Sequence, residues 1–211
     1  INYMQVEIFA YNHDWPGNNL KKWNCTTPQT PWKWFLYDLD WGFVKSYIDN
    51  VFEFLSSKGD VNYANAPEHT YLFRSLLANE NFKKAFINRM TVLLQMNFES
   101  SRILHQIENM MNEIKTEISK DQDRWNLDPS RMNSELEDIK QFATNRQSYL
   151  IKHLQEYFKL NESIPITLSV KGNGQILVHN LPLDKPTLTI PFFKEFPVTI
   201  SAEPENGRSW S

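Results

Sequence analysis

The chain has very little cysteine and no long apolar run, and both absences restrict the kinds of protein it can be. Cys25 is the only cysteine among 211 residues, which excludes an internal disulfide framework and a cysteine-rich zinc site. Cys25 lies in an expected turn with no histidine placed to activate it, so we interpret it as a loop thiol. No stretch of about 18 apolar residues exists, so no segment is predicted to span a membrane.

A strong excess of one charge is also missing. The net charge is −3 and no basic stripe is present, which argues against a nucleic-acid partner and against an anionic membrane surface. Hydrophobic residues make up 41% and aromatic residues 14%, as expected of a folded chain with a core of one or two domains.

The sequence begins without methionine and without a signal peptide. Residues 1–6 have the composition of the inside of a buried element. We therefore expect the sequence to be a piece of a longer protein, with any signal peptide outside it.

The first 40 residues are predicted to form a buried element, a loop and two strands. Apolar residues alternate over residues 1–11 as in a strand, yet the same segment suits a buried helix equally well. Residues 12–19 contain proline and glycine and are predicted to form a loop. Residues 20–23 and 32–39 are rich in aromatic residues and predict two strands joined by a turn.

Two carboxylates lie at alternate positions of the second predicted strand. Side chains two apart share a face, so Asp38 and Asp40 should lie side by side. Neighbouring carboxylates repel each other unless a cation or proton intervenes, which indicates a metal near Asp40. The alternative is that Asp38 caps a turn or pairs with a lysine.

Residues 67–160 have a helical pattern. Asp128, which precedes a proline, predicts a helix start, and Ser134 with Glu137 predicts a capping box. Two long amphipathic helices joined near Asn126 should pack antiparallel. One apolar stripe is formed by Ile103, Ile107, Met110, Ile114 and Ile118.

The composition changes after residue 162, and residues 163–211 predict a small antiparallel β-module that is cut short at Ser211. Residues 166–170 and 176–178 alternate as strands, and the glycine-rich residues 171–174 predict a hairpin turn between them. The predicted fold class is α+β, mainly helical with a β-hairpin and this module.

The loop and the second strand contain a set of residues typical of phosphoryl transfer. Asp14 and Asn19 are five positions apart in the predicted loop, and Asp40 opens an Asp-Trp-Gly step after the hairpin. Kinase-type chemistry needs one carboxylate to take the hydroxyl proton, then an amide and a carboxylate to hold the metal on the phosphates. An Asp and an Asn at this spacing are by themselves a weak signal for a kinase. The order of loop, hairpin and Asp-aromatic-Gly step is a moderately specific one.

These residues also resemble a known family. Residues 12–19, 32–43 and 72–77 are similar to the CotH kinase family, named for the spore coat protein CotH, and the likeness extends over about residues 1–160. The resemblance implies an atypical protein-kinase-like fold, of which residues 1–162 would be the C-terminal lobe with the N-terminal lobe absent.

The resemblance further implies phosphorylation of Ser or Thr in a protein, with ATP and Mg²⁺ or Mn²⁺ as cofactors. By position, Asp14 would be the catalytic aspartate, Asn19 a metal ligand and Asp40 the principal metal aspartate, so that the last two hold the nucleotide through its metal. The expected acceptor is a surface or coat protein of a bacterium. The oligomeric state stays open.

The sequence departs from ordinary kinases in ways that affect the expected activity. His13 precedes Asp14 where ordinary kinases have arginine. We favour a loop histidine bonded to backbone over a residue that organises the site. The hairpin between Asn19 and Asp40 is also longer than in ordinary kinases.

No glycine-rich phosphate loop and no strand lysine paired with a helix glutamate are found, so the fragment is predicted to be inactive alone. The alternatives are a non-catalytic, pseudokinase-like surface binding or scaffold module, and an enzyme that modifies a small molecule or glycan.

Two further features bear on place and partner. The β-module weakly resembles modules of bacterial surface proteins, which favours the cell envelope or exterior. Five tryptophans surround the motif, and we favour core packing over a sugar-stacking surface for them. They are Trp15, Trp23, Trp32, Trp34 and Trp41.

Overall fold

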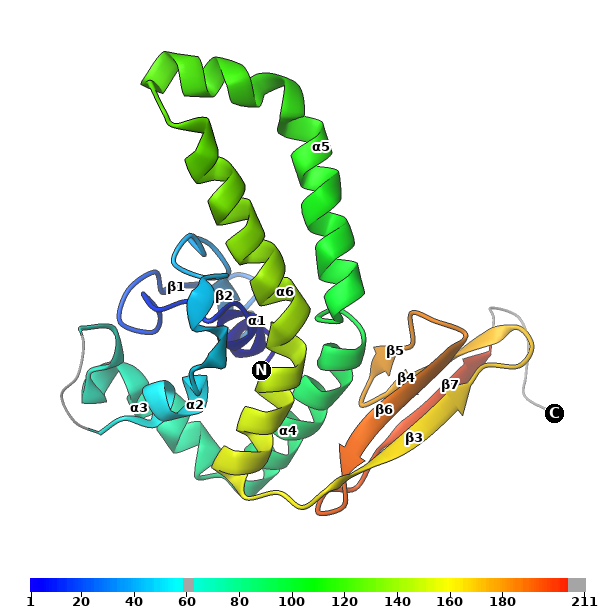
Figure 1. Cartoon of the computed structure of the whole chain (residues 1–211). Coiled ribbons are helices and arrows are strands. Elements are labelled where there is room, and N and C mark those ends of the chain that lie inside the picture. Colours follow the sequence, from blue (N-terminus) through cyan, green and yellow to red (C-terminus); the bar gives the residue numbers. More distant parts are fainter. Residues whose placement is uncertain (59–62, 205–211) are drawn as a thin grey trace.

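The computed structural model describes residues 1–58 and 63–204 and confirms the α+β class (Figure 1). The α-helices are α1 (Asn2–Ala10), α2 (Val51–Ser56), α3 (Pro67–Leu77), α4 (Glu80–Gln95), α5 (Ser100–Trp125) and α6 (Pro129–Phe158), with short 3₁₀ turns η1 (Lys45–Ile48) and η2 (Tyr63–Asn65). The strands are β1 (Lys21–Trp23), β2 (Lys33–Phe35), β3 (Ser163–Ser169), β4 (Gly174–Val178), β5 (Leu181–Pro182), β6 (Thr187–Phe193) and β7 (Ile200–Pro204).

The main core lies where α1, α2, α4 and the C-terminal half of α6 meet. Phe52, Phe86, Phe142 and Leu150 are fully buried there, one or more from each of the last three helices. Helix α1 contributes side chains from almost its whole circumference, including Met4, Gln5, Glu7, Ile8, Phe9 and Ala10. A segment buried on all sides has no polar face to reveal its period, so the sequence left strand and helix open and the packing decides for helix.

Helices α5 and α6 form the predicted antiparallel pair and project from this core (Figure 1). Helix α5 has no buried residue, and in α6 burial begins only at Phe142. Asp128 caps α6 as predicted, accepting from the Ser130 N–H at 2.8 Å, and Asn126 ends α5 in the left-handed conformation. The predicted capping box at Ser134 is wrong, because that residue lies inside α6. Among the described residues, no helix combines the length and apolarity needed to cross a membrane.

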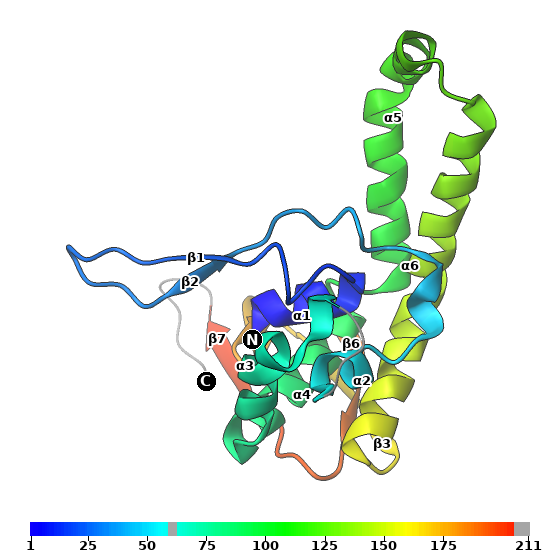
Figure 2. The same cartoon turned by 90° about the vertical axis from the view of Figure 1, so that its left-hand side faces the viewer.

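The predicted hairpin exists as a long arm with a short sheet. Lys21–Trp23 pairs antiparallel with Lys33–Phe35, one isolated bridge joins Thr26 to Gln29, and the arm extends to one side of α1 (Figure 2). The second strand ends well before residue 39, and Asp38 has φ 61°, in the left-handed region. The prediction that Asp38 and Asp40 share a strand face is therefore wrong, because strand alternation does not continue through a left-handed residue.

The β-module contains two small antiparallel sheets. Strand β3 pairs with β6, and β4 lies between β5 and β7. The predicted hairpin at residues 171–174 is wrong, because the turn leads from one sheet to the other. The Val170 N–H donates to the Pro186 carbonyl at 2.8 Å, which continues the pairing of β3 with the chain before β6. The predicted end of the module, residues 205–211, lies outside the described residues.

The β-module packs on the side of α4 that faces away from the main core. Val92 and Met96 of α4 are buried against Val178, Ile190 and Phe192 of the module. Helix α4 thus contributes to two cores, which explains why its buried residues extend around most of the helix.

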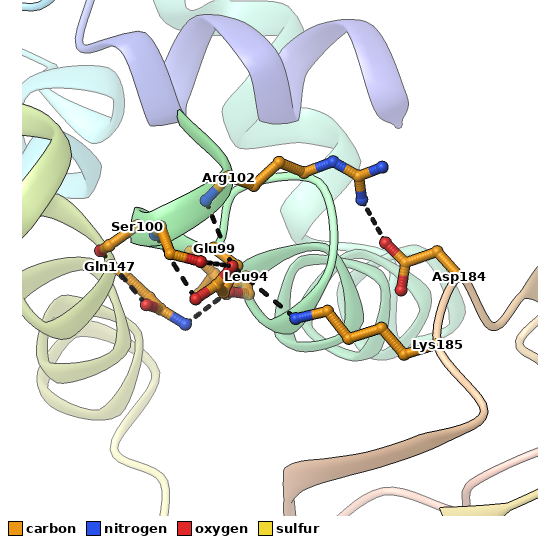
Figure 3. A network of polar contacts seen from close by, with 8 residues as sticks. Leu94, Glu99, Ser100, Arg102, Gln147, Asp184 and Lys185 are labelled. Atoms are coloured by element: carbon orange, nitrogen blue, oxygen red, sulfur yellow. Dashed lines mark hydrogen bonds and ion pairs between the residues drawn. The ribbon is translucent and has the colours of Figure 1, made fainter. Parts of the chain in front are cut away.

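A polar network also joins the module to the helices (Figure 3). Glu99 caps α5 by accepting from the Arg102 N–H, and its carboxylate lies 3.8 Å from the Lys185 ammonium. The side chain of Arg102 pairs with Asp184. The pKa of Glu99 is lowered, mainly by the hydrogen bond from the hydroxyl of Ser101.

The boundary between lobe and module at residue 162 stays a prediction.

Candidate active site

The loop that follows α1 is held by the side chain of Asn12, which sequence reasoning had not selected. Its amide N–H₂ donates to the Glu7 carboxylate at 3.0 Å and to the Asp38 carbonyl at 3.3 Å. Its Oδ1 accepts from the Asp14 N–H at 3.2 Å. Asn12 is buried, so one amide fixes the helix end, the start of the loop and the strand exit together.

Asp14 and Asn19 are brought into direct contact. The Asn19 amide donates to Asp14 Oδ2 at 2.9 Å, and the Asn18 amide donates to the same oxygen at 2.8 Å. The Asn18 N–H also donates to the Asp14 carbonyl at 2.8 Å, which closes the loop. Asn19 has φ 53°, a left-handed conformation that asparagine tolerates better than most residues. The two donors orient the carboxylate, and among the described residues none donates to its other oxygen, Oδ1.

The Asp40-Trp41-Gly42 step packs against the end of α1. The Gly42 N–H donates to the Leu39 carbonyl at 2.9 Å, and the Phe43 N–H donates to the Ala10 carbonyl at 2.8 Å. A Cβ added to Gly42 would lie 2.9 Å from the Ala10 carbonyl oxygen. Glycine is therefore required here because the two backbones approach too closely for any side chain.

His13 connects this step to the Asp14 loop. Its Nδ1 lies 3.2 Å from the Trp41 carbonyl oxygen, and its ring contacts the Tyr11 ring at 4.1 Å between centroids. The favoured interpretation of a histidine bonded to backbone agrees with this contact. Because the carbonyl belongs to the residue after Asp40, the bond also ties the Asp14 loop to the Asp40 segment.

Arg146 of α6 is the largest fully buried side chain among the described residues. It binds backbone groups on both segments that form the candidate site. Its guanidinium donates to the Ile8 carbonyl at 2.6 Å, the Phe9 carbonyl at 2.9 Å and the Tyr47 carbonyl at 3.1 Å. These carbonyls lie just before the Asp14 loop and just after the Asp-Trp-Gly step. Burial lowers the pKa of Arg146 to about 9, opposed by Tyr11 and Asp49, so the group stays charged at neutral pH.

A signal for Arg146 exists in the sequence. The apolar stripe of α6 passes through Ala143 and Leu150, and the two positions of that face between them, 146 and 147, are filled by arginine and glutamine. A charged residue within an apolar stripe is rarely buried unless it is paired. Sequence reasoning missed it because the carbonyls that it binds come from residues far away in the chain.

The residues at the site suit a hard divalent cation on a phosphate. The Asp40 side chain is exposed and forms no hydrogen bond or ion pair with the part of the chain that the structure describes. The Asn19 amide N–H₂ bonds to Asp14 and to the Asp38 carbonyl at 3.5 Å, and its Oδ1 accepts from none of the described residues. Within residues 1–58 and 63–204, no three His, Cys, Asp or Glu side chains are grouped to hold a metal. Mg²⁺ is usually bound by one or two carboxylates, with phosphate oxygens and water as its remaining ligands.

Comparison with known families gives the assignment. The family model described as CotH kinase protein matches residues 1–150, which include the loop, the arm and the Asp-Trp-Gly step. The chain belongs to the CotH kinase family. Comparison with curated proteins and with solved structures gave no match.

Within this CotH-family chain, the structure brings two of the three predicted site residues into direct contact. Asp14 and Asn19 share a hydrogen bond. Asp40 is connected to them through neighbours, by the His13 contact to Trp41 and the Asn12 bond to the Asp38 carbonyl. The catalytic and metal-binding roles of all three stay predictions.

The tryptophans around the motif divide into two groups. Trp15 is buried, and Trp34 stacks on Tyr3 with ring centroids 5.5 Å apart, as core packing predicts. Trp23, Trp32 and Trp41 are exposed, Trp41 to 63%. The favoured interpretation therefore holds for Trp15 and Trp34 and not for Trp23, Trp32 and Trp41.

Proposed function

We propose that this chain is the C-terminal part of a protein kinase that transfers the γ-phosphate of ATP to a Ser or Thr hydroxyl of a protein. The observation that supports the proposal is the Asp14–Asn19 hydrogen bond at 2.9 Å, in a loop tied to the Asp40 segment. Phosphoryl transfer depends mainly on positioning and on charge neutralisation, and a fixed loop with these side chains supplies the first.

Asp14 has the role of orienting the acceptor hydroxyl and taking its proton. Its Oδ2 is occupied by the Asn18 and Asn19 amides, so Oδ1 is the atom that accepts the proton. The oxygen of the acceptor then forms the new bond to phosphorus as the bond to the ADP leaving group breaks.

Asn19 Oδ1 and the Asp40 carboxylate have the role of holding the divalent cation, Mg²⁺ or Mn²⁺, and through it ATP. When bound, the cation neutralises charge on the phosphates. Arg146 and Asn12 do not touch the reacting atoms in this scheme. They hold the two segments at a fixed separation, which matters because small misplacements of catalytic groups cost large factors in rate.

The remaining parts of the proposal concern context. We place the protein at the bacterial cell envelope or exterior, with a surface or coat protein as acceptor, on the resemblance of residues 1–160 and of the β-module. A non-catalytic scaffold is the second candidate. It is favoured by the exposed aromatic side chains of Trp23 and Trp32 on the arm and by the β-module.

The test is transfer of labelled phosphate from ATP by the full gene product that contains this chain, with Mg²⁺ or Mn²⁺ and dephosphorylated casein as acceptor. Asp14→Ala should lower the rate about 10²–10⁴-fold, the range for a general base. Asp40→Asn should abolish metal-dependent nucleotide binding. Asp123→Ala, on the distant helical hairpin, is the matched control and should retain full activity.

Unchanged activity in both site variants would refute the assignment of the site. Absence of both transfer and nucleotide binding in the unmodified product would favour the scaffold. The 211-residue chain alone should show no transfer in the same assay.

A further inference from the structure

The outer part of the α5–α6 hairpin contains a groove that the proposed chemistry does not use. The groove measures about 630 Å³ and lies between the two helices near their connection. Figure 1 shows the last turns of α5 bending over towards α6 around this region. Gln122 and Met132 lie across it, with the Gln122 amide 4.0 Å from the Met132 sulfur.

The floor of the groove is apolar and open to solvent. Ile118 and Met132 are half-buried, whereas Ile114 and Leu127 are 48% and 45% exposed. Met110, one turn before Ile114, is 64% exposed. Contiguous apolar surface of this kind on a projecting element is typical of a binding site for another chain.

The rim of the groove is acidic. Four carboxylates line it against one arginine, and Arg131 is paired with Glu135 at 2.7 Å. Glu117 is paired with Lys120 at 2.9 Å, whereas Asp121 has no ion pair in the described part of the chain. Exposed pairs along one helix contribute little, so a partner's cations can replace them. The four carboxylates are Glu117, Asp121, Asp128 and Glu135.

The outer part of the hairpin is acidic beyond the groove itself. Residues 108–140 hold nine of the 25 acidic residues of the chain but only five of its 22 basic ones. These outer residues of the hairpin are therefore at −4, and the remaining residues of the chain together are at +1. The net negative charge of the chain is thus concentrated on the element that carries the apolar groove.

We propose that the groove between α5 and α6 binds a basic amphipathic helix of a partner protein. An apolar stripe on that helix would cover Ile114, Ile118, Leu127 and Met132, and its flanking Lys or Arg side chains would face the acidic rim. The inference does not depend on the proposed kinase activity, because the hairpin is remote in sequence from Asp14, Asn19 and Asp40.

The test uses the 211-residue chain and a labelled helical peptide of about 18 residues with leucines at i, i+4 and i+7 and lysines elsewhere. Fluorescence anisotropy should show saturable binding that weakens as NaCl is raised. The same peptide with glutamate in place of lysine should bind at least about tenfold more weakly, a difference of about 1.4 kcal/mol.

Variants of the chain locate the binding. Ile114→Ser with Leu127→Ser should weaken binding about tenfold or more, because both contribute exposed apolar surface. Glu117→Lys with Asp121→Lys should weaken it as well. The matched controls are Leu72→Ser, 43% exposed on α3, and Glu162→Lys, an exposed acid outside the hairpin. Neither control should change the affinity, and circular dichroism should show the same helicity for all.

Three results would overturn the proposal. They are equal binding of the acidic and basic peptides, no binding of either, and binding that the groove variants leave unchanged. Self-association of the chain that is lost in the Ile114→Ser, Leu127→Ser variant would also overturn it, because the groove would then bind a second copy.

Discussion

At the scale of single residues, Arg146 connects the most distant parts of the site. One guanidinium binds the last carbonyls of α1 and the Tyr47 carbonyl of η1 while fully buried. Its ring contacts, 5.2 Å to Tyr11 and 5.6 Å to Phe142, fill the space around the charge. Arginine suits this position because its planar fork carries several donors in fixed directions, which a lysine ammonium does not reproduce.

We predict that Arg146→Met destabilises the chain by about 3 kcal/mol. Removal of a buried charge relieves its desolvation, but the buried Ile8 and Phe9 carbonyls then lose their donor at about 1–3 kcal/mol each, and the part-buried Tyr47 carbonyl loses its donor as well. Urea unfolding followed by circular dichroism measures the change. The free energy of unfolding of Arg146→Lys should lie between those of the unmodified chain and Arg146→Met, since one ammonium cannot reach all three carbonyls with good geometry.

The control for this prediction is Arg124→Met. Arg124 lies over the exposed Trp125 ring at 5.2 Å on α5, so its loss should change the free energy of unfolding by no more than about 0.5 kcal/mol. If Arg146→Met left the free energy of unfolding unchanged, the guanidinium would not be needed to hold the two segments.

At the scale of elements, α4 is the helix on which the lobe and the β-module both depend. Phe86, Met90 and Leu94 point into the main core, while Val92 and Met96 pack on the module. The Asn88 amide adds a bond to the Pro197 carbonyl at 3.1 Å. We therefore expect the packing of the module to contribute to the stability of α4.

We predict that Ile190→Ala destabilises the chain by about 2–5 kcal/mol, the range for a large-to-small change in a packed core. Ile190 lies in β6, fully buried in the cluster with Val92. Hydrogen exchange should show faster exchange in α4 as well as in β6, because the two share one core. Ile164→Ala, in β3 and 44% exposed, is the control. Faster exchange in β6 alone would contradict the expected coupling.

At the scale of the whole molecule, charge is distributed unevenly. The helical hairpin is acidic, whereas the arm between residues 15 and 37 contains Lys21, Lys22 and Lys33 and no acid. Each of these lysines lies over an aromatic ring of the arm, at 4.3–5.2 Å from its centroid. Two projecting elements of opposite charge therefore flank the candidate active site (Figure 2).

We predict that the chain loses stability as the pH falls through about 6.5. Burial lowers the pKa of both His153 and His179, helped by Arg146 and Arg89 respectively. In the unfolded chain these histidines bind protons at a higher pH than in the folded one, so acid favours unfolding by up to about 1.4 kcal/mol per pH unit for each. Glu7 acts in the opposite direction at lower pH, because burial raises its pKa.

Urea unfolding at pH 7.5, 6.5 and 5.5 tests this prediction. The variant His153→Gln, His179→Gln should show a clearly smaller loss between the first and last pH. His105→Gln, an exposed histidine on α5, is the control and should follow the unmodified chain. A loss of equal size in the double variant would assign the acid sensitivity to other groups.

Sequence alone determined the features that depend on local pattern. The spacing of Asp14, Asn19 and Asp40, the helical periods of α5 and α6, and the cap at Asp128 are all properties of residues close in the chain. The family assignment follows from the same local motifs, and the family comparison over residues 1–150 confirms it.

Only the tertiary structure decided what depends on contacts between distant residues. Packing that local pattern does not encode fixed three features of the fold. These are the helix at residues 2–10, the end of the second arm strand and the pairing of the strands in the module. The same holds for Arg146 and Asn12, whose partners are backbone carbonyls far away in sequence. A backbone carbonyl has the same chemistry in every residue, so no sequence pattern marks the one that a buried side chain will bind.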